Sequence, residues 1–307
     1  MTTIKNQKRS RLFQVTTWIG LLGLGAYGFF IEPAWIDVSY HRPPNKGLAI
    51  TNYSWAKASK PEAEKEPRFR VVQISDLHLH RLGLTEEKVI EEINALKPNL
   101  LLLTGDIADR PESLDVLDAF LEKVIAKHKY ATLGNWEYWG GVDLQALRRI
   151  YKRHGVVLLV NECVEYSHNG FIYQVAGLDD FTAGNPDERK IYADCKDDLS
   201  DKQASAYLRP NMPSAKPLIL MQHSPGYFEG RAPLEKRVHW ITLSGHTHGG
   251  QVSIFGIPLW TPPGSGKFVS GWYVTGYRDL YVSRGVGTSV APFRFGSRPE
   301  IAVFDSE

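Results

Sequence analysis

Seven side chains of metal-binding type stand in five short blocks, and each block follows directly after an apolar run. They are Asp76, His78, Asp106, Asn135, His223, His246 and His248. Short apolar runs are typical of buried β-strands, and ligands in open α/β sheets bind at the carboxyl ends of the strands. Carboxylates, carbonyl oxygens and neutral imidazoles are ligands of divalent metals. The spacing therefore predicts a metal site at one edge of a sheet.

The densest block is the glycine-rich stretch from Ser244 to Gln251, which holds His246 and His248. A single His-x-His pair is a weak signal, because paired surface histidines occur by chance. Upstream, Asp76-Leu77-His78 also places two potential ligands two residues apart after an apolar run. Three further blocks each place one potential ligand just after such a run. An incidental turn residue is a credible alternative for His223 alone, but not for the whole set.

The elements that must position these blocks change character along the chain. The first half alternates strands with helical patterns, and Val89, Ile90, Ile93 and Leu96 share one face of the first helix. The second half consists mostly of strands. This order predicts an α/β fold, an α+β sandwich of two mixed sheets packed face to face and flanked by helices. Strands are expected at 69–74, 99–104, 130–133, 156–160, 164–167, 171–176, 218–221, 238–243, 251–254, 280–283 and 301–304, and helices near 85–97, 111–124, 143–154 and 201–207.

The N-terminal segment predicts a membrane anchor. Leu12–Ile31 carries no charge and is long enough to span a bilayer as a helix; a cleaved signal peptide is the alternative. Basic residues before the span favour a catalytic domain on the exported side of a bacterial inner membrane. The predicted organisation is a basic segment with anchor at 1–31, a linker at 32–67, in which 50–55 could form an edge strand, and a catalytic domain at 68–307.

Charge and cysteine content narrow the class of protein. The net charge is only +2, and basic residues are interspersed with acidic ones, so no nucleic-acid partner is expected. Cys163 and Cys195 would pair in an exported domain, but we expect buried thiols. The sequence indicates no oligomeric state.

The five blocks, in their order, resemble the calcineurin-like metallophosphoesterase family from about residue 69 to residue 307. The tail, at Tyr281–Ser289 and Arg298–Ile301, is similar to one branch of that family, the membrane-anchored or exported bacterial phosphoesterases. That branch includes enzymes similar to the UDP-2,3-diacylglucosamine hydrolases of lipid A synthesis. The resemblance implies a β-sandwich flanked by helices, with metals at the strand ends.

The resemblance also implies a cofactor of two divalent metal ions, which could be Mn, Fe, Zn, Co or Ni. Asp76, His78 and His248 would hold the first ion, Asp106 would bridge to the second, and Asn135, His223 and His246 would complete the second. A hydroxide between the ions would attack phosphorus in line. Asp106 and Asn135 are thus expected to be catalytic, and Glu137 is expected to orient a metal ligand.

Trp136 departs from the family pattern, because the family has a histidine after Asn135 that helps the leaving group to depart. Loss of such a group typically costs about 10²–10⁴-fold in rate. Three interpretations stay open: His80 substitutes as a catalytic residue from another loop, the substrate has a leaving group that needs no proton, or the protein turns over poorly. In the second case Trp136 would stack on the substrate. Arg284 is a further candidate for substrate binding, and Arg294 and Arg298 could also bind phosphate, with a structural ion pair as the alternative for each.

Together these features predict a metal-dependent phosphoesterase held at a membrane by its N-terminal helix. The favoured substrates are small-molecule or lipid phosphoesters, in particular lipid- or nucleotide-linked phosphodiesters and pyrophosphates. UDP-2,3-diacylglucosamine is a candidate that conflicts with an exported domain, because UDP-sugars are cytoplasmic. A broad exported phosphodiesterase or phosphatase and a non-catalytic metal-binding scaffold are the alternatives.

Overall fold

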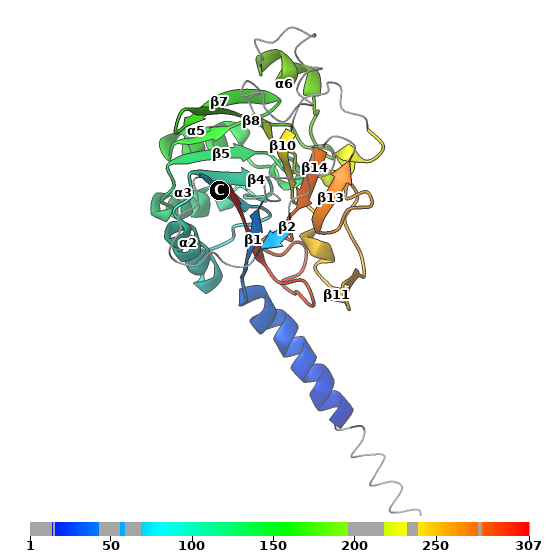
Figure 1. Cartoon of the computed structure of the whole chain (residues 1–307). Helices are drawn as coiled ribbons and strands as arrows, with labels where there is room; N and C mark the ends of the chain where they lie inside the picture. The colour runs from blue at the N-terminus through cyan, green and yellow to red at the C-terminus, as the bar shows by residue number, and fades with distance from the viewer. Residues whose placement is uncertain are drawn as a thin grey trace, which may run out of the picture.

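Two β-sheets packed face to face form the centre of the molecule, and helices lie against their outer faces (Figure 1). The computed structural model describes residues 14, 16–42, 56–58, 69–195, 218–231, 239–275 and 278–306. This architecture is the flanked sandwich that the strand and helix order predicts. The predicted edge strand at 50–55 and the predicted helix at 201–207 lie outside the described residues.

The first sheet has seven strands in the order β2-β1-β15-β3-β4-β5-β6. Strands β3 to β6 run parallel to one another, whereas β15 is parallel to β1 and antiparallel to β3. The parallel strands bring their carboxyl ends to one edge of the sheet. The strands are β1 (Asp37–Arg42), β2 (Ala56–Ala58), β3 (Phe69–Ile74), β4 (Leu100–Thr104), β5 (His128–Thr132), β6 (Val156–Leu158) and β15 (Glu300–Ser306).

The second sheet has six strands in the order β13-β14-β10-β9-β8-β7. Strands β8, β9, β10 and β14 are parallel, and β7 joins β8 through a hairpin in which Asn169 and Gly170 both have positive φ. A separate hairpin, β11 (Ser253–Ile254) and β12 (Ile257–Pro258), follows β10. The six strands are β7 (Glu162–His168), β8 (Phe171–Gly177), β9 (Leu218–Met221), β10 (His239–Ser244), β13 (Gly271–Thr275) and β14 (Arg278–Val282).

Side-chain alternation along the first sheet builds two cores. Val71 and Leu102 point into the core between the sheets, while Val72 and Leu101 point into the core under the helices. The predicted apolar face of α2, from Val89 to Leu96, is buried in the second of these cores. The helices are α2 (Leu84–Leu96), α3 (Ser113–Lys123), α4 (Asn135–Trp139), α5 (Leu144–Arg153) and α6 (Glu188–Asp194).

The segment predicted as a linker contributes strands to the first sheet. β1 pairs with β15 from Asp37 to His41, and β2 pairs with β1. β1 has no apolar run, because the polar residues Ser39 and His41 alternate with Val38 and Tyr40. Ser39 and His41 are nevertheless buried. A search for apolar runs therefore could not find this strand.

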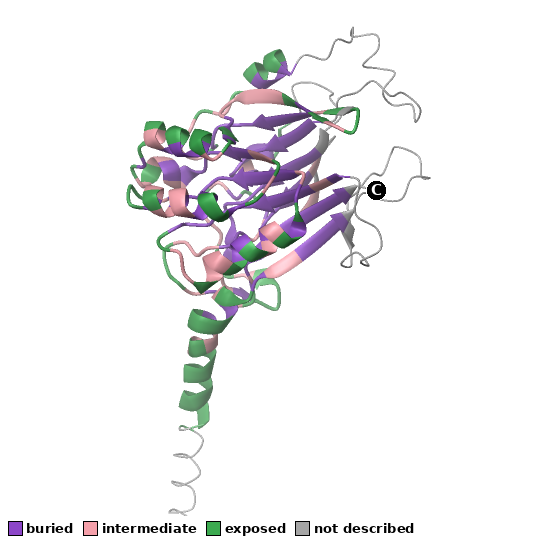
Figure 2. Cartoon of the chain, turned by 90° about the vertical axis from the view of Figure 1, so that its left-hand side faces the viewer, coloured by how far each residue is buried: buried purple, intermediate pink, exposed green. Residues whose placement is uncertain are grey.

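The N-terminal helix projects away from the sheets (Figure 1), and most of its residues are exposed (Figure 2). Residues 16–26 are α-helical and continue into a π-helical turn, η1 (Tyr27–Ile31). At the foot of the helix, the backbone N–H of Arg294 donates to the carbonyl of Gly28 at 2.9 Å. Over the part of the chain that the structure describes, no helix has both the length and the apolar content to cross a membrane.

Cys163 and Cys195 form a disulfide, with Cα atoms 5.6 Å apart, so the expectation of buried thiols is wrong. The bond ties the end of α6 to β7, the edge strand of the second sheet. The residues between β8 and α6 show no periodic pattern, so the sequence did not indicate that they return Cys195 to Cys163.

Replacing both cysteines, with Cys163→Ser and Cys195→Ser, is expected to lower the free energy of unfolding by about 3 kcal/mol. The physical reason is that the bond restricts the unfolded chain across a separation of 32 residues. Urea denaturation followed by circular dichroism measures the change. Dithiothreitol should shift wild-type protein to the midpoint of the double variant and leave that variant unchanged; equal midpoints for oxidised and reduced wild type would contradict the bond.

Candidate metal centre

The loops after β3, β4, β9 and β10 meet the start of α4 at one edge of the sandwich, and they bring all seven predicted metal ligands together. Asp76, His78 and His248 form one triad of potential ligand atoms within 4.8 Å of one another. Asp106, His223 and His246 form a second triad with the same property.

The two triads are neighbours, and Asp106 lies between them. Its Oδ2 atom is 3.1 Å from His223 Nε2 in its own triad and 3.8 Å from His78 Nε2 in the other. Asn135 joins the second triad, with its Oδ1 atom 2.7 Å from His246 Nδ1. This is the arrangement that two adjacent metal ions with one shared carboxylate require.

A buried ring nitrogen that faces a carboxylate tests whether the triads fit metal ions. His223 Nε2 is fully buried and lies 3.1 Å from Asp106 Oδ2, but without the geometry of a good hydrogen bond. An unsatisfied buried polar atom costs about 1–3 kcal/mol. The other ring nitrogen, Nδ1, donates to the carbonyl of Thr104 at 2.8 Å, which directs the Nε2 lone pair into the triad. A divalent ion would satisfy that lone pair together with the adjacent carboxylate of Asp106, so the residues fit a metal.

Two candidate ligands have the protonation states that metal binding needs. Burial disfavours the charge on Asp106, but the positive charge and hydrogen bond of His223 outweigh burial and lower the pKa of Asp106 to about 2. In return, burial disfavours the charge on His223, but the charge of Asp106 outweighs burial and raises the pKa of that imidazole well above its ordinary value, so a metal ion there would displace a proton. Burial, His78 and Arg294 together lower the pKa of His248 well below its ordinary value. At neutral pH Asp106 and His248 are thus a carboxylate and a neutral imidazole, the forms that bind metal.

Glu137 holds two of the ligand loops together, as predicted from its position. Its buried carboxylate accepts hydrogen bonds from the backbone N–H groups of Asp106 at 3.0 Å and Gly134 at 2.8 Å. It also accepts from Ile107 at 2.7 Å and Ala108 at 3.2 Å. Burial and the charge of Asp106 raise the pKa of Glu137 to about 7.

Five of the seven predicted ligands have left-handed backbone conformations, a feature that no sequence pattern indicated. Their φ angles are 53° for Asp76, 45° for His78, 53° for Asp106, 70° for His246 and 50° for His248. This region costs L-residues roughly 1–2 kcal/mol each, and such strain clusters at functional sites.

Three of the seven candidate ligands, Asp106, Asn135 and His246, follow a glycine that the available space requires. A Cβ atom on Gly105 would lie 2.6 Å from His223 Nδ1, and one on Gly134 or Gly245 would overlap Asp106 or Ser75. The Gly-Asp, Gly-Asn and Gly-His pairs in the sequence therefore reflect close approach of neighbouring loops.

His80 and Trp136 both border the first triad. His80 is exposed, and its Nε2 is 2.7 Å from Asp109 Oδ2, which in turn lies 3.4 Å from His78 Nδ1. Burial opposes the charge on Asp109, but hydrogen bonds from His78 and His80 lower the pKa of Asp109 below its ordinary range. The Trp136 ring lies edge-on to His78, with centroids 6.2 Å apart.

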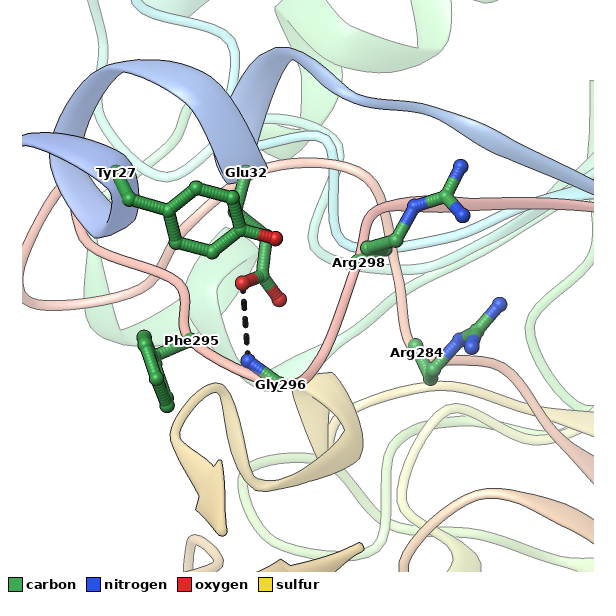
Figure 3. Close-up of a pocket in the computed structure, with 6 residues that line it drawn as sticks. All are labelled: Tyr27, Glu32, Arg284, Phe295, Gly296 and Arg298. Carbon is green, nitrogen blue, oxygen red and sulfur yellow. Dashed lines mark hydrogen bonds between the residues drawn. The ribbon is translucent and has the colours of Figure 1, made fainter. Parts of the chain in front are cut away.

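Arg284 forms ion pairs with two carboxylates that belong to neither triad. Its Nη2 atom pairs with Asp37 at 2.7 Å and with Glu300 at 3.1 Å. The side chain lines a cavity of about 300 Å³ at the foot of the N-terminal helix, as Figure 3 shows. In the structure, Arg284, which was predicted to contact the substrate, therefore takes part in structural ion pairs. The other lining residues are Tyr27, Glu32, Phe295, Gly296 and Arg298.

Arg294, one of the predicted candidates for phosphate binding, lies behind His248. It is fully buried, and its Nη2 atom lies 3.2 Å from His248 Nδ1 and donates to the carbonyl of Arg284 at 3.0 Å. It also donates to the carbonyls of Gly287 and Ser297. Arg294 therefore holds the tail loop against the second His-x-His ligand. Its place in the tail made it a candidate in the sequence, but its contact with a candidate metal ligand depends on the fold.

Comparison with known proteins shows which protein family has this site. A model of the calcineurin-like phosphoesterases matches residues 69–250, which include all seven ligands. The chain belongs to the calcineurin-like phosphoesterase family. As a phosphoesterase it is a hydrolase, and its two triads hold the ligands for two divalent metal ions.

The phosphoesterase is also similar to individual bacterial proteins. It is 34% identical over 246 residues to YkuE of Bacillus subtilis, an uncharacterized metallophosphoesterase, which covers 77% of this chain and 78% of that protein. It is 26% identical over 311 residues to the phosphodiesterase YaeI of Escherichia coli, which covers 97% of this chain and 98% of that one. An uncharacterized metallophosphoesterase of Aquifex aeolicus is 31% identical over 256 residues, or 79% and 87% of the two chains.

Gly105→Ala is expected to displace metal from the second triad, because the added methyl group meets His223 Nδ1 and the Gly134 backbone. Gly155→Ala is the matched control, since Gly155 also has positive φ but open space around its Cβ position. Both variants should lose roughly 1–2 kcal/mol of stability from backbone strain. Metal content measured by mass spectrometry should fall only in Gly105→Ala; equal metal content in the two variants would rule out the steric argument.

Proposed function

We propose that this phosphoesterase hydrolyses phosphodiesters at its two-metal centre. The observation that carries the proposal is the pair of adjacent triads with Asp106 between them. Two ions bound there would supply an activated water nucleophile and stabilise the charge on the phosphoryl oxygens.

The chain's own residues position that chemistry. The backbone N–H of Trp136 donates to Asp106 Oδ1 at 2.8 Å, which leaves Oδ2 facing the histidines of both triads. Asn135 presents its carbonyl oxygen beside His246. Trp136 itself forms an aromatic wall with Trp139, whose ring centroid is 6.1 Å away, and this wall could stack on a substrate group.

His80 is our candidate for the proton donor that Trp136 cannot supply. Asp109 accepts a hydrogen bond from His80 and lies beside His78, so the carboxylate links the exposed imidazole to a metal ligand. Arg110 Nη2 lies 2.8 Å from the same His80 nitrogen and adds a positive charge at this rim. An exposed His–Asp pair at the edge of a metal centre can give a proton to a departing alkoxide.

Three features support a lipid-linked diester and an exported enzyme. YaeI, a relative over nearly the whole chain, is named a phosphodiesterase. The N-terminal helix exposes apolar side chains that would hold the enzyme at a membrane surface. The Cys163–Cys195 disulfide favours an oxidising compartment and weighs against a cytoplasmic UDP-lipid.

The experiment compares a phosphodiester, a phosphomonoester and a UDP-lipid as substrates for the full chain loaded with manganese. We expect turnover of the diester, which Asp106→Asn should reduce to background because an amide is a poorer metal bridge. Asp118→Asn, a surface aspartate paired with Arg153, is the matched control and should keep full activity. Two bound metals without turnover of any ester would instead favour the non-catalytic scaffold.

His80→Gln is expected to lower kcat on a dialkyl diester by about 10²–10⁴-fold, because an alkoxide needs a proton to depart. Turnover of a p-nitrophenyl diester should change much less, since p-nitrophenolate leaves unprotonated. His154→Gln is the control, because His154 makes the same 2.7 Å contact with a carboxylate, that of Asp118, away from the site. Equal losses on both esters would exclude a proton-donor role for His80.

A further inference from the structure

Exposed apolar side chains gather on the hairpin that follows the His-x-His ligands. We call this set the hairpin patch; it consists of Ile254, Phe255, Ile257, Leu259 and Trp260. Phe255 at the turn is fully exposed, and Ile257 and Trp260 are 69% and 63% exposed. From Val252 to Trp260 the chain contains no charged residue. Exposed apolar side chains grouped within one short uncharged segment are typical of an interaction site.

The hairpin is joined to the foot of the N-terminal helix through the tail loop. Val252 forms a β-bridge with Phe295, and the N–H of Ser253 donates to the Phe295 carbonyl at 2.7 Å. The Phe295 ring then meets Tyr27 of the helix, with centroids 6.0 Å apart. Figure 1 accordingly places β11 at the end of the domain from which the helix leaves, and Figure 3 shows Phe295 and Tyr27 across the cavity there.

The hairpin is equally close to the metal centre. Only four residues, Gly249 to Val252, separate His248 from Ser253, where the hairpin begins. Ser253 Oγ donates to the Gly249 carbonyl at 3.0 Å, and a Cβ atom on Gly250 would overlap Pro258 of β12. Whatever contacts the hairpin patch therefore lies beside the ligand loop.

The exposed residues of the N-terminal helix indicate what kind of environment the hairpin patch contacts. Trp18, Ile19, Leu21, Leu22 and Leu24 are each more than half exposed. At about 100° per residue they leave no gap wider than about 140° around the helix. A helix that is apolar on all sides is stable in an apolar medium. Two exposed tryptophans, Trp35 after the helix and Trp260 after the hairpin, are of the type enriched at the boundary between lipid and water.

We propose that the β11–β12 hairpin inserts its apolar tip into the lipid bilayer surface and thereby holds the metal centre against that surface. The inference rests on the proposed function, because it places the phosphoesterase beside lipid-linked substrates. It adds a second, separate lipid contact to the helix. The two contacts would prevent the domain from turning about the helix and would direct one side of the centre to the membrane.

A single-site probe tests the insertion in the full chain. The only two cysteines are bonded to each other, so Phe255→Cys gives one attachment point for an environment-sensitive fluorophore. Ile125→Cys is the control, because Ile125 is 72% exposed and precedes β5, away from the carboxyl ends of the strands. Both proteins are reconstituted with vesicles of phosphatidylethanolamine and phosphatidylglycerol that contain doxyl-labelled lipid.

We expect a blue shift and quenching by doxyl lipid for the probe at residue 255, and quenching by aqueous iodide for the probe at residue 125. Iodide quenching at both positions would overturn the insertion. A shift at residue 255 that depends on protein concentration rather than on lipid would assign the hairpin patch to a second copy of the chain and would also overturn it.

A soluble p-nitrophenyl diester separates this test from that of the proposed function. The double variant Phe255→Ser, Ile257→Ser should cleave that diester at the wild-type rate, yet lose rate on a diester embedded in the same vesicles. No turnover of the soluble diester by wild type would contradict the function itself. Equal rates of wild type and double variant on both substrates would contradict only the insertion.

Discussion

Two aspartates buried next to each other, Asp76 and Asp106, set the main constraint on this protein. Isolated buried carboxylates are very unfavourable unless cations or hydrogen bonds compensate them, and four histidines surround this pair. The sandwich meets the requirement because parallel strands in both sheets end at the same edge. Each loop then has to deliver only one or two ligands, so the cost of organising the site is divided among five segments.

The free-energy cost of organising the site lies in strained backbone conformations rather than in strained side chains. Left-handed φ angles at five ligands are unfavourable locally, and they persist because stronger contacts determine the loop paths. Glu137 fixes the loop after β4 through consecutive N–H groups, and Arg294 fixes the loops around His248 through carbonyls. The buried carboxylate of Glu137 thus accepts hydrogen bonds from backbone N–H groups, and the buried guanidinium of Arg294 donates hydrogen bonds to backbone C=O groups.

Sequence reasoning could select the seven candidate ligands because each has its own local signal, a polar residue after an apolar run, and those runs are strands in the structure. It missed β1, in which polar Ser39 and His41 are buried, and it missed Asp109 and the contact between Arg294 and His248, because both depend on distant loops. The disulfide and the ion pairs of Arg284 are likewise long-range. Features contained in a short stretch of sequence could be predicted. Contacts between residues far apart in the sequence could not, because they depend on the fold.

The position of β15 has a consequence for how the enzyme matures. This strand comes late in the chain but lies between β1 and β3, where it pairs with both. During synthesis, the first sheet stays divided until β15 is made, because non-local pairings form only when both partners are present. Glu300 of β15 also holds Arg284 and Tyr281 near the ligand loops. A chain that lacks only β15 would therefore carry all seven candidate ligands while its first sheet remained in two parts.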